Sequence, residues 1–444
     1  MSGISVSSAA EYAPAAQRFR VSTKVVLQGA LLALTLGNVG RIPLLNLGER
    51  TAPLLINDLA VAAVIIVGAI AMVQARSLRF DDVTMAAVVF ASIGALSTLA
   101  GVERFGLSAM EVIASLAYLA RWLVYLALYV VLVNCLRASD SESIWAALET
   151  ALLLITAFGI VQAIFLPDFA FMVFPDARPV YDFDQQKHRL VSTILEPNLA
   201  AGMILTGLLV QLARISTGAR VPLWKPVLMF AGLVATLSRG AMLALVIGVL
   251  ILLAIRRPTK RLWKLAAILF VLVAAALPKL VQLANAYARL TVTDASALAR
   301  VVMWQRAIET FLEHPWFGIG FNTYGFVQER RGFERLGGAA YSVEGGLLFV
   351  AVLTGIVGLV VYLGMLFFVL RRAWLGWHLR DTTPAERGLL IGTAVATLAI
   401  LVQSVFANSL LTPMVMEPLW VLWGLTFVIV SALQNPAAHG TAGG

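Results

Sequence analysis

The sequence predicts an all-α membrane protein that crosses the bilayer many times. Of its 444 residues, 60% are hydrophobic and only 13% are charged, and the mean hydropathy is +0.88. A soluble core cannot hide that much apolar surface. Long apolar stretches recur along the chain, separated in two places by long polar segments. Because every backbone group inside a bilayer must be hydrogen-bonded, we expect the apolar stretches to be helices.

Composition also argues against several other classes. The formal net charge of +9 would suggest nucleic acid as a partner of a soluble protein, but here the basic residues lie between apolar runs, where they set orientation. We therefore expect no nucleic-acid partner. The single cysteine, Cys135, cannot form an intramolecular disulfide. The four histidines are scattered without ligand spacing, so we expect no metal and no cofactor.

Twelve apolar stretches are candidates for membrane spans, since a helix needs roughly 20 residues to cross about 30 Å of hydrocarbon. The seventh and eighth are separated only by Ser238-Arg239-Gly240. The candidates are about 25–45, 55–75, 83–101, 110–136, 143–166, 194–213, 222–238, 240–255, 263–283, 344–370, 386–408 and 416–434.

These spans divide the chain into three parts. Residues 1–24 are expected to be a cytoplasmic tail, followed by an uncleaved first span. Residues 25–434 form one transmembrane domain, which carries the candidate catalytic residues described below. The Ala/Gly-rich end, 435–444, is expected to be disordered.

Basic residues predict the orientation. If the N-terminus is inside, eighteen Lys and Arg residues fall on the inner side and four in the short outer connections. This bias is typical of a membrane protein with both termini in the cytoplasm. The eighteen are Arg18, Arg20, Lys24, Arg76, Arg79, Arg137, Arg214, Arg220, Lys225, Arg256, Arg257, Lys260, Arg261, Lys264, Arg371, Arg372, Arg380 and Arg387, and the four are Arg41, Arg50, Arg104 and Arg239.

Two outer loops are long, at about 167–193 and 284–343. In the larger one, apolar residues at helical spacing predict an amphipathic helix over about 296–313. His314-Pro315 should end it, and Gly318-Ile319-Gly320 should form a tight turn. The apolar positions are Leu298, Val301, Val302, Ile308 and Leu312.

Arginines on the outer side are the first candidates for chemistry. Arg239 lies at the tip of a helical hairpin, and an arginine near the membrane is costly unless it binds an anion. The alternative is a snorkelling side chain that anchors the hairpin. Arg300 lies one turn before Trp304 on the predicted loop helix, where a surface salt bridge is the simpler interpretation. Arg189 closes the other long loop.

The segment after Arg189 predicts a helix start. Thr193 and Glu196 fit a capping box, with Pro197 in the first turn, so Glu196 is interpreted as a cap rather than a catalyst. A helix start directs backbone N–H groups outward, which suits an anion. Asn198 is a supporting candidate in the same segment.

Glu344 precedes two glycines, Gly345 and Gly346. It is predicted to begin a membrane-spanning helix on the outer side. A carboxylate in a first turn also complements the helix dipole, so a cap is again the alternative. The two glycines are poor helix formers, and we interpret them as leaving room for a ligand. Trp304 and Tyr341 are supporting candidates. Three arginines and a carboxylate on one side could bind a diphosphate and activate a hydroxyl.

At these residues the chain resembles the superfamily of O-antigen ligases and O-antigen polymerases. The motifs cover roughly residues 189–358. One position differs: the family's ligases carry a histidine where this chain has Glu344. The matching motifs are Ser238-Arg239-Gly240; Arg300 and Trp304 upstream of His314-Pro315-Trp316-Phe317-Gly318-Ile319-Gly320; and Arg189 through Pro197-Asn198.

The resemblance implies a glycosyltransferase of the bacterial inner membrane whose active site faces the periplasm. Its donor would be a glycan on undecaprenyl diphosphate, its acceptor a glycan or lipid A core, and no metal would be needed. A chain-length regulator and a flippase are further implied partners. We expect a polymerase, with Glu344 as base and the three arginines binding the diphosphate. The alternatives are a ligase and, from another class, a twelve-span transporter or lipid flippase.

Overall fold

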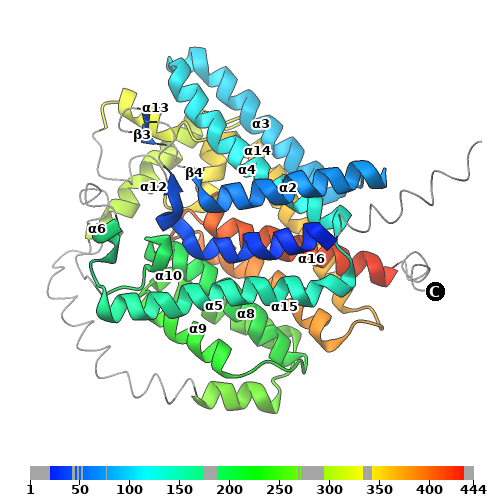
Figure 1. Ribbon diagram of the computed structural model, residues 1–444. Helices are drawn as coiled ribbons and strands as arrows, with labels where there is room; N and C mark the ends of the chain where they lie inside the picture. The colour runs from blue at the N-terminus through cyan, green and yellow to red at the C-terminus, as the bar shows by residue number, and fades with distance from the viewer. Residues whose placement is uncertain are drawn as a thin grey trace, which may run out of the picture.

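The computed structural model (Figure 1) is an all-α bundle, as predicted. It describes residues 21–42, 46–47, 50–51, 54–76, 78–173, 188–268, 271, 295–333 and 343–434. Within these residues, nine helices are long and apolar enough to cross a membrane. The predicted tail at 435–444 lies outside this part of the chain, as do residues 1–20 of the predicted tail at 1–24, Tyr341 and much of both long loops. Residues 21–24 are already helical.

The helices follow the predicted spans closely. The long ones are Val21–Gly40, α2 (Ile56–Ala75), α3 (Asp82–Phe105), α4 (Ala109–Cys135), α5 (Ser141–Phe165), α8 (Pro197–Ser216), α14 (Gly346–Trp377), α15 (Pro384–Gln403) and α16 (Pro413–Gln434). The shorter ones are α6 (Phe169–Val173), α9 (Trp224–Ala235), α10 (Arg239–Ile255), α12 (Ala295–Glu313) and α13 (Tyr324–Arg330).

Eleven of the twelve predicted spans therefore coincide with a helix. The seventh and eighth are the separate helices α9 and α10, of 12 and 17 residues. At 1.5 Å per residue, α9 rises only about 18 Å, less than the hydrocarbon thickness. Of the predicted span at 263–283, residues 263–268 are helical, and the rest lies almost entirely outside the described residues.

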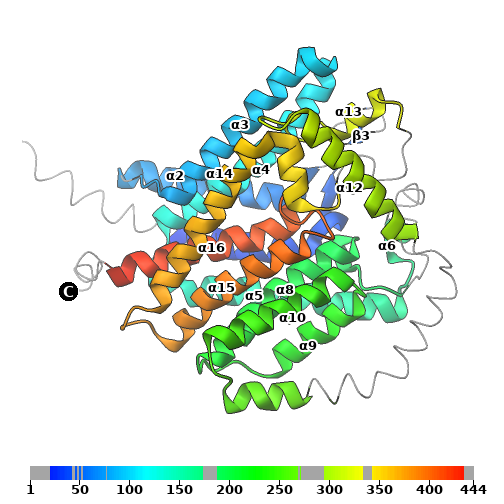
Figure 2. The ribbon, with the colours of Figure 1, turned by 180° about the vertical axis from the view of Figure 1, so that it is seen from behind.

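Helices α8 and α16 form the centre of the bundle. In each, 94% of the apolar window is buried inside the protein. Helix α8 packs against α15, and α16 packs against α4. Figures 1 and 2 show that α3, α4 and α14 lie on one side of this centre, with α5, α9 and α10 on the other.

Two glycines explain how closely α15 approaches α8. Gly388 and Gly392 lie one turn apart, and a Cβ on either would come within 2.6 or 2.7 Å of the Cα of Arg214 or Val210. Small residues at this spacing let membrane helices pack backbone to backbone.

Helices α6, α12 and α13 gather at one end of the bundle, and the C-terminus lies at the other (Figures 1 and 2). Near the first end, the connection between the first two long helices contains two antiparallel pairs of very short strands. They are β1 (Arg41–Ile42) with β4 (Leu54–Leu55), and β2 (Asn46–Leu47) with β3 (Arg50–Thr51).

The predicted amphipathic loop helix is present as α12, and it ends at Glu313 as expected. Its predicted apolar face is largely turned outward: Val301 and Ile308 are each 46% exposed and Leu312 is 67% exposed. Ala307 instead is buried, in a small core cluster shared with the start of α14. An exposed apolar stripe on such a helix suits contact with lipid at the membrane surface.

Helix α14 is interrupted at Gly355, whose φ of 67° and ψ of −172° are not helical. The segment after α12 fills the interruption. The N–H of Ile356 donates to the carbonyl of Pro315 (2.7 Å), and the N–H groups of Ile319 and Gly320 donate to carbonyls on the N-terminal side of the break (3.0 Å each). Backbone groups that the helix leaves open are thus paired by the loop, as a membrane environment requires.

Candidate functional site

The turn between α9 and α10 carries the Ser-Arg-Gly element. Ser238 is the N-cap of α10, and its hydroxyl donates to the side-chain oxygen of Asn198 on α8 (2.9 Å). Arg239 is exposed at the first position of the helix. A Cβ on Gly240 would come within 2.8 Å of Phe406, so glycine lets the start of α10 pack against the segment that follows α15. The contacts of Ser238 and Gly240 therefore fix the position of the Arg239 backbone relative to α8 and to the segment that follows α15.

The start of α8 differs from the predicted capping box. Glu196, not Thr193, is the N-cap residue, because the Glu196 carboxylate accepts the N–H of Leu199, with Pro197 next in the first turn. The Thr193 hydroxyl is buried and has no hydrogen-bond partner among the residues that the structure describes. Glu196 is thus a cap, as interpreted, but through a different partner. Its other oxygen accepts from the Asn198 amide (3.0 Å).

Arg189 joins this segment to the end of α9. Its Nε donates to the carbonyl of Thr236 (2.9 Å), and the N–H of Leu190 donates to the carbonyl of Ala235 (2.9 Å). Arg189 and Glu196 lie within electrostatic range of each other. The predicted link between the Arg189 segment and the hairpin is therefore direct.

Glu344 lies two residues before α14, which begins at Gly346 rather than at Glu344 as predicted. The carbonyl of Glu344 accepts the indole N–H of Trp304 on α12. The Glu344 charge also reaches Glu196. Glu344 is therefore outside the first helical turn, and its backbone carbonyl is held by Trp304 of α12.

The two glycines after Glu344 have structural reasons, which corrects the interpretation that they leave room for a ligand. Gly345 has φ of 146°, a conformation that side chains disfavour. Gly346 donates its N–H to the carbonyl of Ser404 (2.6 Å), and a Cβ there would come within 3.0 Å of Ser404 and Leu410. The space is filled by α15 and the segment that follows it.

The end of α15 contributes residues that the sequence analysis missed. Gln403 is 1% exposed, and its amide donates to the backbone carbonyl of Asn198 (3.0 Å) while its oxygen accepts from Ser409. In the sequence, the signal that could have identified Gln403 was a polar amide at the end of an apolar run. Together with Ser404 and Ser238, it fastens the starts of α8, α10 and α14 to one another.

Four of the predicted elements thus meet at one end of the bundle: the Arg189 segment, the start of α8, the α9–α10 turn and the Glu344 segment. Arg300 lies on α12 one turn before Trp304, but its side chain is outside the described part. Tyr341 is outside it altogether. Among the residues the structure describes, there is no cluster of three or more His, Cys, Asp or Glu residues with the geometry of a metal site.

Residues 226–363 match the family described as O-antigen ligase. The predicted resemblance to the O-antigen ligase and polymerase superfamily is confirmed. The match runs from α9 through the interruption of α14, so it includes Arg239, α12 and Glu344. No curated protein matches the chain. The family match and the apolar helices indicate a membrane glycosyltransferase of the ligase or polymerase type, with glycan and lipid-linked substrates.

Proposed function

We propose that the protein polymerises lipid-linked oligosaccharide repeat units at the outer face of the bacterial inner membrane. The donor is a glycan on undecaprenyl diphosphate, and the acceptor is a sugar hydroxyl on a second lipid-linked unit. The observation that carries the proposal is the meeting of Arg189, Glu196, the start of α10 and the Glu344 segment at one end of the bundle.

The chemistry is a direct displacement. The acceptor hydroxyl oxygen bonds to the anomeric carbon of the donor, its proton passes to the Glu344 carboxylate, and the bond to the diphosphate breaks with the electron pair staying on the diphosphate oxygen. A single displacement inverts the anomeric carbon. Arg239, Arg300 and Arg189 stabilise the departing diphosphate through charge-assisted hydrogen bonds. The start of α10 adds N–H groups and the positive end of a helix dipole.

The roles of the two carboxylates follow from their contacts. Burial raises the pKa of Glu196, and its hydrogen bonds from Leu199 and Asn198 offset part of that rise. Both of its oxygens are already engaged at the start of α8, so its contacts are those of a helix cap. Glu344 lies outside any helix and next to the indole of Trp304. In the resembling ligases a histidine occupies its place. We therefore assign Glu344 as the base, with Asn198 and Trp304 as supporting residues.

The proposed orientation puts α6, α12 and α13 in the periplasm and both termini in the cytoplasm, and the positive-inside bias supports it. Cysteines introduced at Gln305 on α12 and at Lys260 test it, since both positions are exposed and the native Cys135 is buried. A membrane-impermeant reagent added to spheroplasts should label the first and not the second. The reverse pattern would overturn the orientation and, with it, a periplasmic site.

Purified protein incubated with lipid-linked repeat units tests the reaction. We expect a ladder of products, with inversion at the new linkage. A ligase is the second candidate, favoured by the description of the matching family. Single transfer to added lipid A core without a ladder would establish the ligase and overturn the polymerase.

A further inference from the structure

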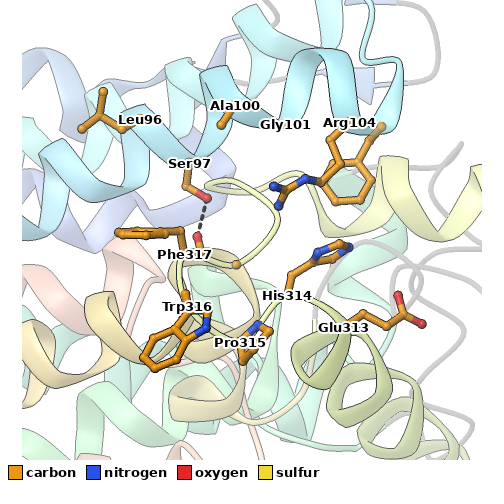
Figure 3. A pocket seen from close by; sticks show the side chains of 12 residues that line it. Leu96, Ser97, Ala100, Gly101, Arg104, Glu313, His314, Pro315, Trp316 and Phe317 are labelled. Atoms are coloured by element: carbon orange, nitrogen blue, oxygen red, sulfur yellow. Dashed lines mark hydrogen bonds between the residues drawn. The ribbon is translucent and has the colours of Figure 1, made fainter.

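A pocket of about 820 Å³ lies between α3 and the segment that follows α12, away from the α8–α10 contacts of the proposed site. Figure 3 shows its charged side chains at one end and its large apolar ones at the other. The volume is in the range of sites that hold small molecules or lipids. Its lining consists of Leu96, Ser97, Ala100, Gly101, Arg104, Phe105 and residues 313–318.

The apolar end opens onto the outside of the bundle. Leu96 on α3 is 67% exposed, and Trp316 and Phe317 on the opposite wall are 68% and 58% exposed. Because α3 is long and apolar enough to span a membrane, we expect the surface around Leu96 to face lipid. Large apolar side chains on both sides of an opening to the bilayer suit hydrocarbon chains.

The other end of the pocket carries the positive charge of Arg104. Arg104 is exposed and forms no ion pair in the part of the chain that the structure describes. Glu313 is also in the lining, but its carboxylate is engaged by Arg331. His314 stacks edge-on against Phe105, with ring centroids 5.1 Å apart. Burial lowers the pKa of His314, and Arg104 lowers it further, so the surroundings of the ring favour its neutral form.

The charged and apolar ends of the pocket are separated along α3. Arg104 and Leu96 are eight residues apart on α3, which corresponds to about 12 Å of helix rise. Arg104 lies near the end of α3 that reaches α12, and Leu96 lies deeper. A cation at the surface above an apolar slot matches an amphiphile with an anionic head.

Hydrogen bonds between α3 and the loop backbone hold the pocket wall in place. The hydroxyl of Ser97 donates to the carbonyl of Phe317, and the N–H of Phe321 donates to the hydroxyl of Thr98 (2.8 Å). The same loop pairs with the interruption of α14 through Ile356. The wall is therefore formed without a ligand, and a ligand here would brace the family's His-Pro motif against α3.

We propose that this pocket binds a membrane glycerophospholipid of net charge −1, such as phosphatidylglycerol, with its phosphate at Arg104 and an acyl chain between Leu96, Trp316 and Phe317. One guanidinium matches one phosphodiester, whereas a diphosphate carries more charge than Arg104 alone balances. The lipid is a bound component of the protein, separate from the substrates of the proposed reaction.

The experiment uses purified full-length protein in detergent, titrated with phosphatidylglycerol that carries brominated acyl chains. Bromine quenches nearby tryptophans, so the Trp316 signal is the difference between the wild type and Trp316→Phe. We expect saturable quenching of Trp316. The control is Trp374, which is 53% exposed near the C-terminal end of α14, far along that helix from the interruption at Gly355. It should be quenched only at higher lipid concentrations.

Variants of the charge identify the headgroup contact. Arg104→Gln should weaken the affinity for phosphatidylglycerol about tenfold, since a charge-assisted hydrogen bond is lost. Arg104→Lys should restore part of it, and Arg380→Gln, an exposed arginine near the other end of α14, should leave it unchanged.

Four outcomes would overturn the proposal: equal quenching of Trp316 and Trp374, unchanged affinity in Arg104→Gln, equal affinity for brominated diacylglycerol, or displacement of the lipid by polyprenyl diphosphate at a lower concentration. The last would assign the pocket to a substrate lipid. None of these measurements uses glycosyl transfer, so failure of the proposed function and failure of the lipid site are separate results.

Discussion

The two ends of α8 hold their charged residues in different ways. At the Ser216 end, the Arg214 guanidinium makes two hydrogen bonds to the Glu142 carboxylate, each 2.8 Å. Close by, Lys225 pairs with Glu149. At the Pro197 end, no direct ion pair joins Glu196 and Arg189 in the described residues. Glu196 caps the helix, and Arg189 donates to a backbone carbonyl.

We interpret the difference as one between a structural end and the end that we propose to bind the substrate. The two-pronged pair engages both terminal nitrogens of Arg214 and both oxygens of Glu142, and the Nε of Arg214 is buried, so the pair leaves little to offer a substrate. A guanidinium has five N–H donors, and the bond from Arg189 to Thr236 uses one of them. The Pro197 end therefore keeps hydrogen-bonding capacity for an anion, beside the Glu344 segment.

The largest effect is expected for Glu344→Gln. The amide keeps the shape of the side chain but removes the basic oxygen, so turnover should fall by roughly two to four orders of magnitude. Donor affinity should survive on the arginines. The measurement is turnover and affinity for lipid-linked donor in detergent.

Glu196→Gln is the matched control. It should cost mainly helix-cap stability, about 1 kcal/mol or less, and leave turnover near the wild-type value. If Glu344→Gln polymerised normally while Glu196→Gln folded but was inactive, the assignment of the base would pass to Glu196.

Exchanging arginine for lysine compares the proposed site with the paired end of α8. Arg239→Lys and Arg189→Lys should each lower turnover about 100-fold, because an ammonium cannot reproduce the planar two-pronged contact to a diphosphate. Arg214→Lys should instead lower Tm and leave the turnover of the folded fraction intact. Equal losses of turnover at all three positions would remove the distinction between the two ends.

A third test concerns Gly355, where pairing is by backbone rather than by charge. Its φ and ψ lie in a region populated almost only by glycine, and a Cβ would come within 2.1 Å of the Trp316 carbonyl oxygen. Gly355→Ala should therefore lower the free energy of unfolding by about 1–3 kcal/mol. Gly364→Ala on the same helix has open space and is the control. An unchanged Tm in Gly355→Ala would contradict the docked loop.

The smallest effect is a pH dependence of stability from His314. Because its pKa is lowered by burial and by Arg104, the unfolded chain binds more protons than the folded chain around the ordinary histidine pKa of about 6.5. Stability should therefore decrease as the pH falls through that range. His314→Gln should flatten the decrease in Tm between about pH 7.5 and 5.5. An equally steep decrease in the variant would assign it to other groups.

Local patterns were sufficient for most of the fold. The length of each apolar run predicts a span because a chain in hydrocarbon must pair its own backbone groups, and helices do so within a few residues. The end of α12 before His314-Pro315 and the turn at Gly318 and Gly320, both at positive φ, were predictable from the backbone preferences of proline and glycine. The proposed site lies on the predicted elements, although the roles of Glu344 and the arginines stay predictions.

Tertiary structure decided the partners of those elements. The sequence around Thr193 suggests a capping box, yet Glu196 itself caps α8. Gly346 bonds to Ser404, and Asn198 bonds to Gln403 and Ser238, over separations of 58, 205 and 40 residues. The interruption of α14 is likewise paired by a loop that precedes it by some forty residues. Such contacts depend on which helices pack side by side, and that choice arises from packing over the whole bundle rather than from any local spacing of residues.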